Sequence, residues 1–251
     1  MKIASVVCLL LLFGASKLPF EEQLASERRA AYFHGAHFSL GLRDQIGQLG
    51  FVAALSGFRA LVADLLWIEA HSSWERTEWG KMALLFENVT ALQPRALLFW
   101  DMAAWHMAWN ASVAAFNDPK QPRETLRIKA QREYFQVGKD FLVRGIKNNP
   151  DRYLLYDRLG MLERDKLQDH CAAAKQYELA ANFPDAPVYV KRFAAYELSY
   201  CAGHEREAYE RLRKFYLLGE NERVPTLLSR LKALQEKLNV PVAERVYNQT
   251  Q

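Results

Sequence analysis

Hydrophobic positions recur at helical spacing through most of this chain. From Phe58 onward, apolar residues return every three or four positions, as they do along one face of an α-helix. The first such stripe is Leu61, Leu65, Ile68 and Ser72. No strand-like alternation of useful length interrupts this pattern, so the sequence predicts an all-α fold.

The helical pattern breaks at intervals, and the breaks predict helices arranged in pairs. A proline or glycine follows the second helix of each expected pair, and proline stops a helix because it lacks the N–H donor. We therefore expect an α-solenoid of about four antiparallel helix pairs, with one more amphipathic helix as a C-terminal cap. The expected helices begin at residue 58 and then cover 78–91, 97–116, 124–147, 153–167, 171–182, 188–201, 205–218 and a stretch around 227–238.

Three prolines close these pairs with a partly regular period. Pro150 and Pro184 are 34 positions apart, whereas Pro94 and Pro150 are 56 apart, which is the same period with an insertion of 22. A 34-residue period is typical of stacked helix–turn–helix repeats. Solenoids of this kind mostly bind other proteins, so the period indicates a kind of function without naming a partner.

Small and large residues also follow a fixed spacing on the second helices. A small residue is followed by a large one four positions later, by a small one after three more, and then by a proline. The two clearest examples are Gly138, Leu142, Gly145 and Pro150, then Ala173, Tyr177, Ala180 and Pro184. Together with the pair Leu159-Gly160 in a first helix, this spacing resembles the tetratricopeptide repeat family.

That resemblance implies a binding groove lined by the first helix of each pair. Exposed positions on these helices would then contact a partner, and we expect Tyr153, Tyr156, Arg192 and Tyr196 to do so. The runs 57–67, 91–95 and 105–110 are also similar to uncharacterised tetratricopeptide-like envelope proteins of bacteria, a resemblance that carries no known activity.

The N-terminus has the pattern of an export signal. Lys2 precedes an apolar run that ends in small residues at positions 14–16. Lys17 interrupts the run before the roughly 20 residues that a full membrane span needs, although an uncleaved anchor remains open if Lys17 reaches the interface. We expect an exported chain that is either periplasmic or anchored in the inner membrane, with its repeats outside the cytoplasm.

These observations divide the chain into four segments. We expect a signal peptide or anchor at 1–20, a linker with a glycine-punctuated lead-in at 21–57, the repeats at 58–223, and the cap with its tail at 224–251. The apolar stretch 46–57 is either a packed lead-in to the first long helix or an element that lies on a membrane or a partner.

The cysteines give a specific expectation. Cys8 lies in the expected signal, which leaves Cys171 and Cys201. Cys171 begins the second helix of one pair and Cys201 ends the first helix of the next, so stacking would place them at the same end. Because cysteines of exported chains can pair, we predict a Cys171–Cys201 disulfide, with two buried thiols as the alternative.

Aromatic and polar residues in the N-terminal half leave two further questions open. All six tryptophans lie between Trp67 and Trp109, where they form either an aromatic core or a recognition groove or interfacial belt. Asp101, His106 and Asn110 interrupt an otherwise apolar helix. His106 and Asn110 share a face, and we expect a structural hydrogen bond between them, with a metal or catalytic site as the alternative.

Composition narrows the function further. The 33 basic and 29 acidic residues give a net charge of +4 that is spread along the chain, so no nucleic-acid partner is expected. Because the chain has no glycine-rich phosphate loop, no paired Cys-x-x-Cys and no nucleophile elbow, we expect no enzyme, no metal, no cofactor and no small-molecule substrate. The favoured function is a non-catalytic scaffold for other envelope proteins. The alternatives are a structural subunit of a larger membrane complex and an enzyme that uses Asp101, His106 and Asn110.

Overall fold

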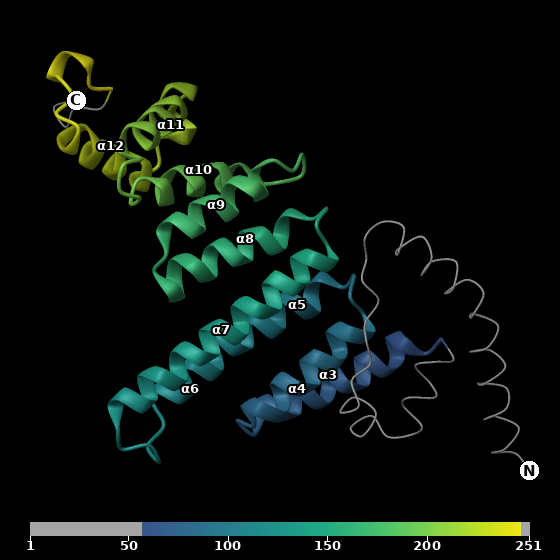
Figure 1. Cartoon of the computed structure of the whole chain (residues 1–251). Coiled ribbons are helices and arrows are strands. Elements are labelled where there is room, and N and C mark those ends of the chain that lie inside the picture. The colour runs from purple at the N-terminus through teal and green to yellow at the C-terminus, as the bar shows by residue number, and fades with distance from the viewer. Residues whose placement is uncertain (1–56, 247–251) are drawn as a thin grey trace, which may run out of the picture. The chain divides into compact units, whose positions relative to one another are not determined.

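The structure, a computed structural model, describes residues 57–246 (Figure 1). This part of the chain is all-helical, without a strand, as the hydrophobic pattern predicts. It divides into two compact units, and the boundary between them lies between Asn149 and Pro150. The expected signal or anchor, the lead-in up to residue 56 and the tail 247–251 lie outside the described residues.

Unit 1, which ends at Asn149, contains two sets of packed helices. Helix α3 (Arg59–Glu75) packs against α4 (Trp79–Leu92). Helix α5 (Leu97–Trp105), the π-helical turn η1 (His106–Ala111) and α6 (Ser112–Phe116) follow without a break, and all three pack against the long helix α7 (Glu124–Asn148). The helix expected at 97–116 is therefore present over its full length, with a π-helical turn in its middle.

Small residues bring α3 close to α4. The buried face of α3 consists of Val62, Ala63, Ala70 and Ser73, whereas Leu61, Leu65 and Ile68 are 54%, 58% and 62% exposed. An apolar stripe at this spacing ordinarily faces the core. Here the small side chains do so, because they allow two helices to approach closely, and the large ones remain on the surface.

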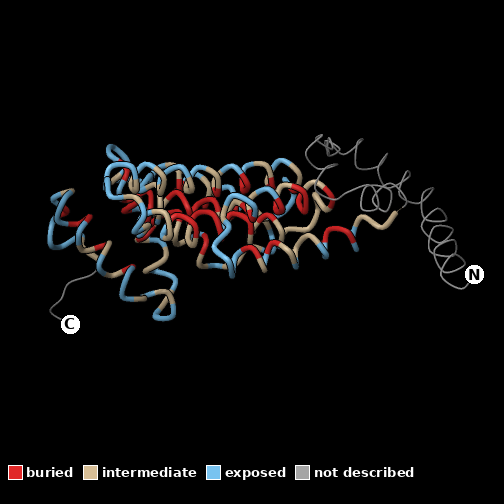
Figure 2. The backbone as a smooth tube through the Cα atoms, turned by 90° about the horizontal axis from the view of Figure 1, so that it is seen from below, coloured by how far each residue is buried: buried red, intermediate tan, exposed pale blue. Residues whose placement is uncertain are grey.

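Unit 2, which begins at Pro150, is a succession of shorter helices in which each one packs against the next. Its first helix, α8, continues directly into the π-helical turn η2, and the turns η3 and η4 follow α11 and α12. Figure 2 shows the buried residues gathered where helices face one another. The elements are α8 (Tyr153–Leu162), η2 (Glu163–Leu167), α9 (His170–Ala181), α10 (Val188–Leu198), α11 (Glu205–Leu218), η3 (Glu220–Glu222), α12 (Pro225–Lys237) and η4 (Val242–Glu244).

Gly160 and Tyr177 set the approach of α8 to α9. A Cβ atom on Gly160 would lie 3.1 Å from atoms of the Tyr177 ring, and Tyr177 is 1% exposed. The large ring of Tyr177 on α9 thus fills the space that Gly160 on α8 leaves open. Within residues 57–246, no helix combines the length and the apolar composition that a membrane span requires.

Candidate functional site

A ridge of apolar side chains lies exposed along α5, η1 and α6. Leu98, Trp105, Val113 and Phe116 are 58%, 41%, 48% and 37% exposed. Met102 and Trp109, both half-buried, fill the intervening positions. At 1.5 Å per residue these side chains extend over about 27 Å. We call this set of six residues the aromatic ridge: Leu98, Met102, Trp105, Trp109, Val113 and Phe116.

Two tryptophans form the centre of the aromatic ridge. The rings of Trp105 and Trp109 are stacked, with their centroids 4.7 Å apart and their planes at 10°. Stacking fixes the orientation of both indoles, and Trp105 remains 41% exposed. Large, rigid aromatic side chains of this kind contribute strongly to protein interfaces.

Other tryptophans lie inside unit 1. Trp100 is 4% exposed and donates its indole N–H to the carbonyl oxygen of Pro94 at 3.0 Å. The half-buried Trp67 packs against Phe86 and Phe99, with ring centroids 5.6 and 5.1 Å away. The tryptophans therefore differ in their surroundings: Trp100 and Trp67 pack inside unit 1, whereas Trp105 is on the surface.

The π-helical turn η1 begins directly after Trp105. A π-helical turn adds a residue to the normal repeat, which shifts the side chains that follow it around the axis, and such turns are frequent at functional sites. His106 and Met107, the first two residues of η1, point into the core at 7% and 0% exposure, whereas Trp105 before them is on the surface.

His106 is held inside an aromatic cage. The amide nitrogen Nδ2 of Asn110 donates to Nδ1 of His106 at 2.9 Å, as the sequence predicts, which leaves the proton of the neutral ring on Nε2. The ring of Phe86 stacks on the imidazole and Trp74 meets it edge-on, both with centroids 5.8 Å away.

Burial, with a smaller contribution from the neighbouring His71, lowers the pKa of His106 to about 4. The imidazole is therefore neutral near pH 7 and a weak base. Asp101 precedes His106 by five positions, so on a regular helix its side chain points about 140° away from that of His106.

The structure brings His106 and Asn110 together as a hydrogen-bonded pair within the core.

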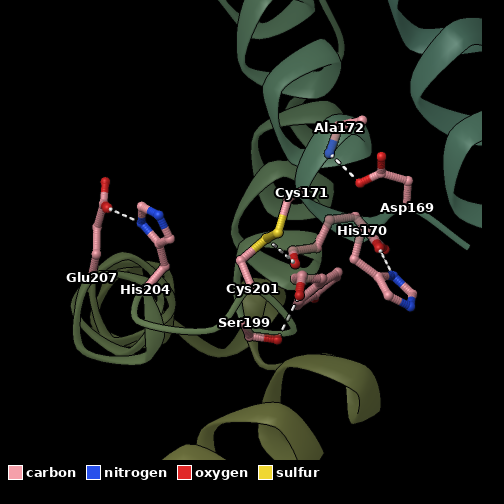
Figure 3. Close-up of a disulfide and its surroundings, with 10 residues drawn as sticks. Asp169, His170, Cys171, Ala172, Ser199, Cys201, His204 and Glu207 are labelled. Atoms are coloured by element: carbon pink, nitrogen blue, oxygen red, sulfur yellow. Dashed lines mark hydrogen bonds and ion pairs between the residues drawn. A yellow bond between two sulfur atoms is a disulfide. The ribbon is translucent and has the colours of Figure 1, made fainter.

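The predicted disulfide is present in unit 2 (Figure 3). Cys171 and Cys201 are bonded, with their Cα atoms 5.4 Å apart. Cys171 is exposed in the first turn of α9, where Asp169 caps the helix by accepting the backbone N–H of Ala172 at 2.9 Å. Cys201 is 2% exposed and follows α10, so the bond joins the start of α9 to the end of α10.

Polar and aromatic contacts surround the disulfide. His170 Nδ1 lies 2.7 Å from a carboxylate oxygen of Glu197, which is 5% exposed. The imidazole also stacks on Tyr200, and the Arg230 guanidinium lies 3.8 Å from the centroid of the Tyr200 ring. Because Arg230 donates to Ser199 as well, this network connects α9, α10 and α12.

The four expected partner-binding residues all lie in unit 2 but differ in exposure. Tyr153 and Tyr156 are half-buried at the start of α8, and Arg192 is half-buried on α10. Arg192 forms an ion pair with Glu222 at 2.6 Å. Tyr196 is 6% exposed, so the expectation that it is an exposed position is wrong: it belongs to the core between α10 and the C-terminal helices.

Comparison with known proteins adds no relative: no protein-family model, no curated protein and no solved structure matches this chain. Within residues 57–246, no group of three or more histidine, cysteine, aspartate or glutamate side chains is placed to hold a metal ion.

Sequence reasoning missed Leu98, Val113 and Phe116 as surface residues. Their helical spacing is visible in the sequence, but the opposite face of the same helix is apolar too, so periodicity alone does not distinguish the two faces.

Proposed function

We propose that this chain is a non-catalytic scaffold that holds other proteins of the bacterial cell envelope together. The observation that carries this proposal is the aromatic ridge of unit 1, where Trp105 and Val113 remain 41% and 48% exposed. Large apolar side chains in a continuous row are costly to leave in water, and such rows mark sites of protein or membrane interaction. A partner that covers the ridge would remove this cost.

We further propose that the helices form antiparallel pairs of the tetratricopeptide-like kind. The consecutive packing of the helices and the close contact between Gly160 and Tyr177 support this arrangement within unit 2. Small residues at helix contacts, large residues opposite them and a proline after the second helix are what such a repeat needs.

Export to the envelope is the second part of the proposal. The apolar run after Lys2 supports it, and the Cys171–Cys201 bond is compatible with it because disulfides persist in oxidising compartments. The protein would be periplasmic, or anchored in the inner membrane by residues 1–20.

Photo-crosslinking in cells tests the scaffold. A photoreactive phenylalanine analogue replaces Trp105 or Val113 in the full chain, and the matched control places it at Gln136, an exposed position on α7. We expect crosslinks to one or a few envelope proteins from positions 105 and 113 and none from 136. Crosslinks that stay within the chain, or that are equal at all three positions, would contradict a partner on the ridge.

The same experiment separates the scaffold from the alternative of a structural subunit in a larger membrane complex. Crosslinked partners that co-purify in fixed stoichiometry after gentle membrane extraction would support the subunit. Partners that dissociate and exchange would support the scaffold.

A further inference from the structure

Unit 2 contains an open groove between α9, α10 and α11. Its volume is about 570 Å³, within the range of binding sites for ligands and short peptide segments. The floor is apolar and consists of Ala181, Ala194, Ala195 and Phe215. The groove exists because three of these four residues are alanines, whose short side chains leave the space between the helices unfilled.

One wall of the groove is closed by a paired arginine. Arg211 of α11 forms an ion pair with Glu178 of α9, and a second one with Glu207 at 2.6 Å. Two carboxylates thus satisfy the charge of this guanidinium, which ties α11 to α9 beside the floor. Arg211 and Glu178 therefore shape the groove and leave its charge close to neutral at this wall.

Two other cations give the groove its positive character. Lys191 of α10 and Lys214 of α11 both line it and both are exposed. Neither ammonium has an ion-pair partner among the side chains that the structure describes. An occupant that supplies carboxylates would find two cations available on different helices.

The apolar surface continues beyond one end of the floor. Val188 precedes Lys191 by three positions and Leu218 follows Lys214 by four, so each shares a helix face with a rim lysine. They are 54% and 72% exposed. The ion pair between Arg192 and Glu222, at 2.6 Å, joins the N-terminal half of α10 to the turn η3 that follows α11. Val188 and Leu218 therefore lie at the same end of the groove.

We propose that this groove binds an acidic, apolar segment of a partner protein. Large apolar side chains of the segment pack on the alanine floor and on Phe215, while its carboxylates pair with Lys191 and Lys214. The exposed amide of Asn182, on the same lining, can hydrogen-bond the backbone of the segment. This is a second binding surface that involves none of the residues of the aromatic ridge.

The balance of charge and apolar area favours an acidic, apolar peptide segment over nucleic acid as the occupant of the groove. Nucleic-acid surfaces present many cations in a row, because each neutralised phosphate adds to affinity. This groove has two available cations above an apolar floor, with further apolar side chains at one end. Such a combination matches a peptide in which acidic and apolar residues alternate, as in amphipathic segments that dock in grooves.

Selection from a random library of displayed 12-residue peptides tests the proposal with the full-length protein. The matched controls are Arg206→Glu, on α11 outside the groove, and Lys147→Glu, on α7; each makes the same change of charge at an exposed cation. We expect selected peptides to combine aspartate or glutamate with large apolar residues. Lys191→Glu combined with Lys214→Glu should weaken their binding at least tenfold, and the two controls combined should change it less than twofold.

A variant without a charge change tests the shape of the groove. Ala181→Trp places an indole over the floor from α9, and we expect it to weaken the selected peptides at least tenfold as well. Selected peptides that carry no excess of acidic residues, or that bind the lysine variant as tightly as the wild type, would overturn the proposal. Crosslinking from the aromatic ridge is a separate measurement. The proposal for the groove and the proposal for the ridge can therefore each be contradicted without affecting the other.

Discussion

Gly138 of α7 lies directly against Ala108 of η1. A Cβ atom on Gly138 would be 2.7 Å from the Cβ of Ala108 and 2.9 Å from the carbonyl oxygen of Ala104. Real Cβ atoms essentially never come so close to other heavy atoms, so only glycine fits at this position. The contact holds α7 against the π-helical turn that begins at His106.

Replacing Gly138 by alanine should therefore destabilise the protein. Alanine favours a helix over glycine by roughly 1 kcal/mol, but overpacking a tight contact costs about 1 to 3 kcal/mol, and here backbone as well as side chain must move. We expect a net loss of up to about 2 kcal/mol in the free energy of unfolding, measured by urea denaturation.

Gly80 of α4 provides the matched control, because nothing lies within 4 Å of the position that its Cβ would take. Gly80→Ala should be neutral or stabilise the protein by up to about 1 kcal/mol. If both substitutions had the same effect, the close contact at Gly138 would not limit the packing of α7.

Much of the fold follows from the sequence because local signals agree with packing. The expected helix at 205–218 coincides with α11 (Glu205–Leu218), and the expected segment 153–167 coincides with α8 and η2 taken together. Helix α11 begins with charged residues and ends at Gly219, so residues at its two ends are enough to set its limits.

The π-helical turns and the candidate surfaces were not predictable in this way. Leu98 and Trp100 are equally apolar in the sequence, yet one is 58% and the other 4% exposed. Which of them faces the core depends on where α7 packs against α5, which is a tertiary effect. Likewise, nothing in the sequence distinguishes Lys191 and Lys214 from ordinary solvated lysines. Only the packing of α10 and α11 places both at one groove.

Breaking the Cys171–Cys201 bond should cost much stability. The bond closes a loop with a sequence separation of 30. By loop-closure entropy, such a crosslink stabilises the folded chain by roughly 3 to 4 kcal/mol. We expect Cys171→Ser combined with Cys201→Ala to lower the free energy of unfolding by that amount, measured by urea denaturation.

Reducing agent gives the control for this prediction. Dithiothreitol should destabilise the wild type about as much as the double substitution does, and should leave the variant unchanged. Non-reducing peptide mapping that recovers both cysteines as free thiols in protein isolated from cells would contradict the bond.

Export is tested by a fusion of alkaline phosphatase to the C-terminus. This enzyme becomes active only where its own disulfides form, so we expect activity in the full-length fusion and none after deletion of residues 2–20. Sequencing the N-terminus of the isolated protein then separates the two forms. A start after Ala15 or Ser16 would indicate a cleaved signal, and retained Met1 would indicate an anchor. Activity that persists without residues 2–20 would contradict an N-terminal export signal.

His106 should make the stability of the protein depend on pH. Its pKa is lowered to about 4 in the folded chain, mainly by burial, whereas an unfolded histidine titrates near 6.5. The unfolded chain therefore takes up the proton first as the pH falls. The stability that neutral His106 contributes is fully present above about pH 6.5 and is lost progressively as the pH falls toward 4.

The expected size is about 2 kcal/mol between pH 7.5 and pH 5, and His106→Gln should remove it because glutamine stays neutral throughout. Urea denaturation at both pH values measures the difference. The control is His71→Gln, which removes an exposed histidine nearby and should retain most of the dependence, since burial is the main cause of the shift. An unchanged pH dependence in His106→Gln, or half-titration of the His106 ring near pH 6.5 by NMR, would show that the imidazole is not confined to its aromatic cage.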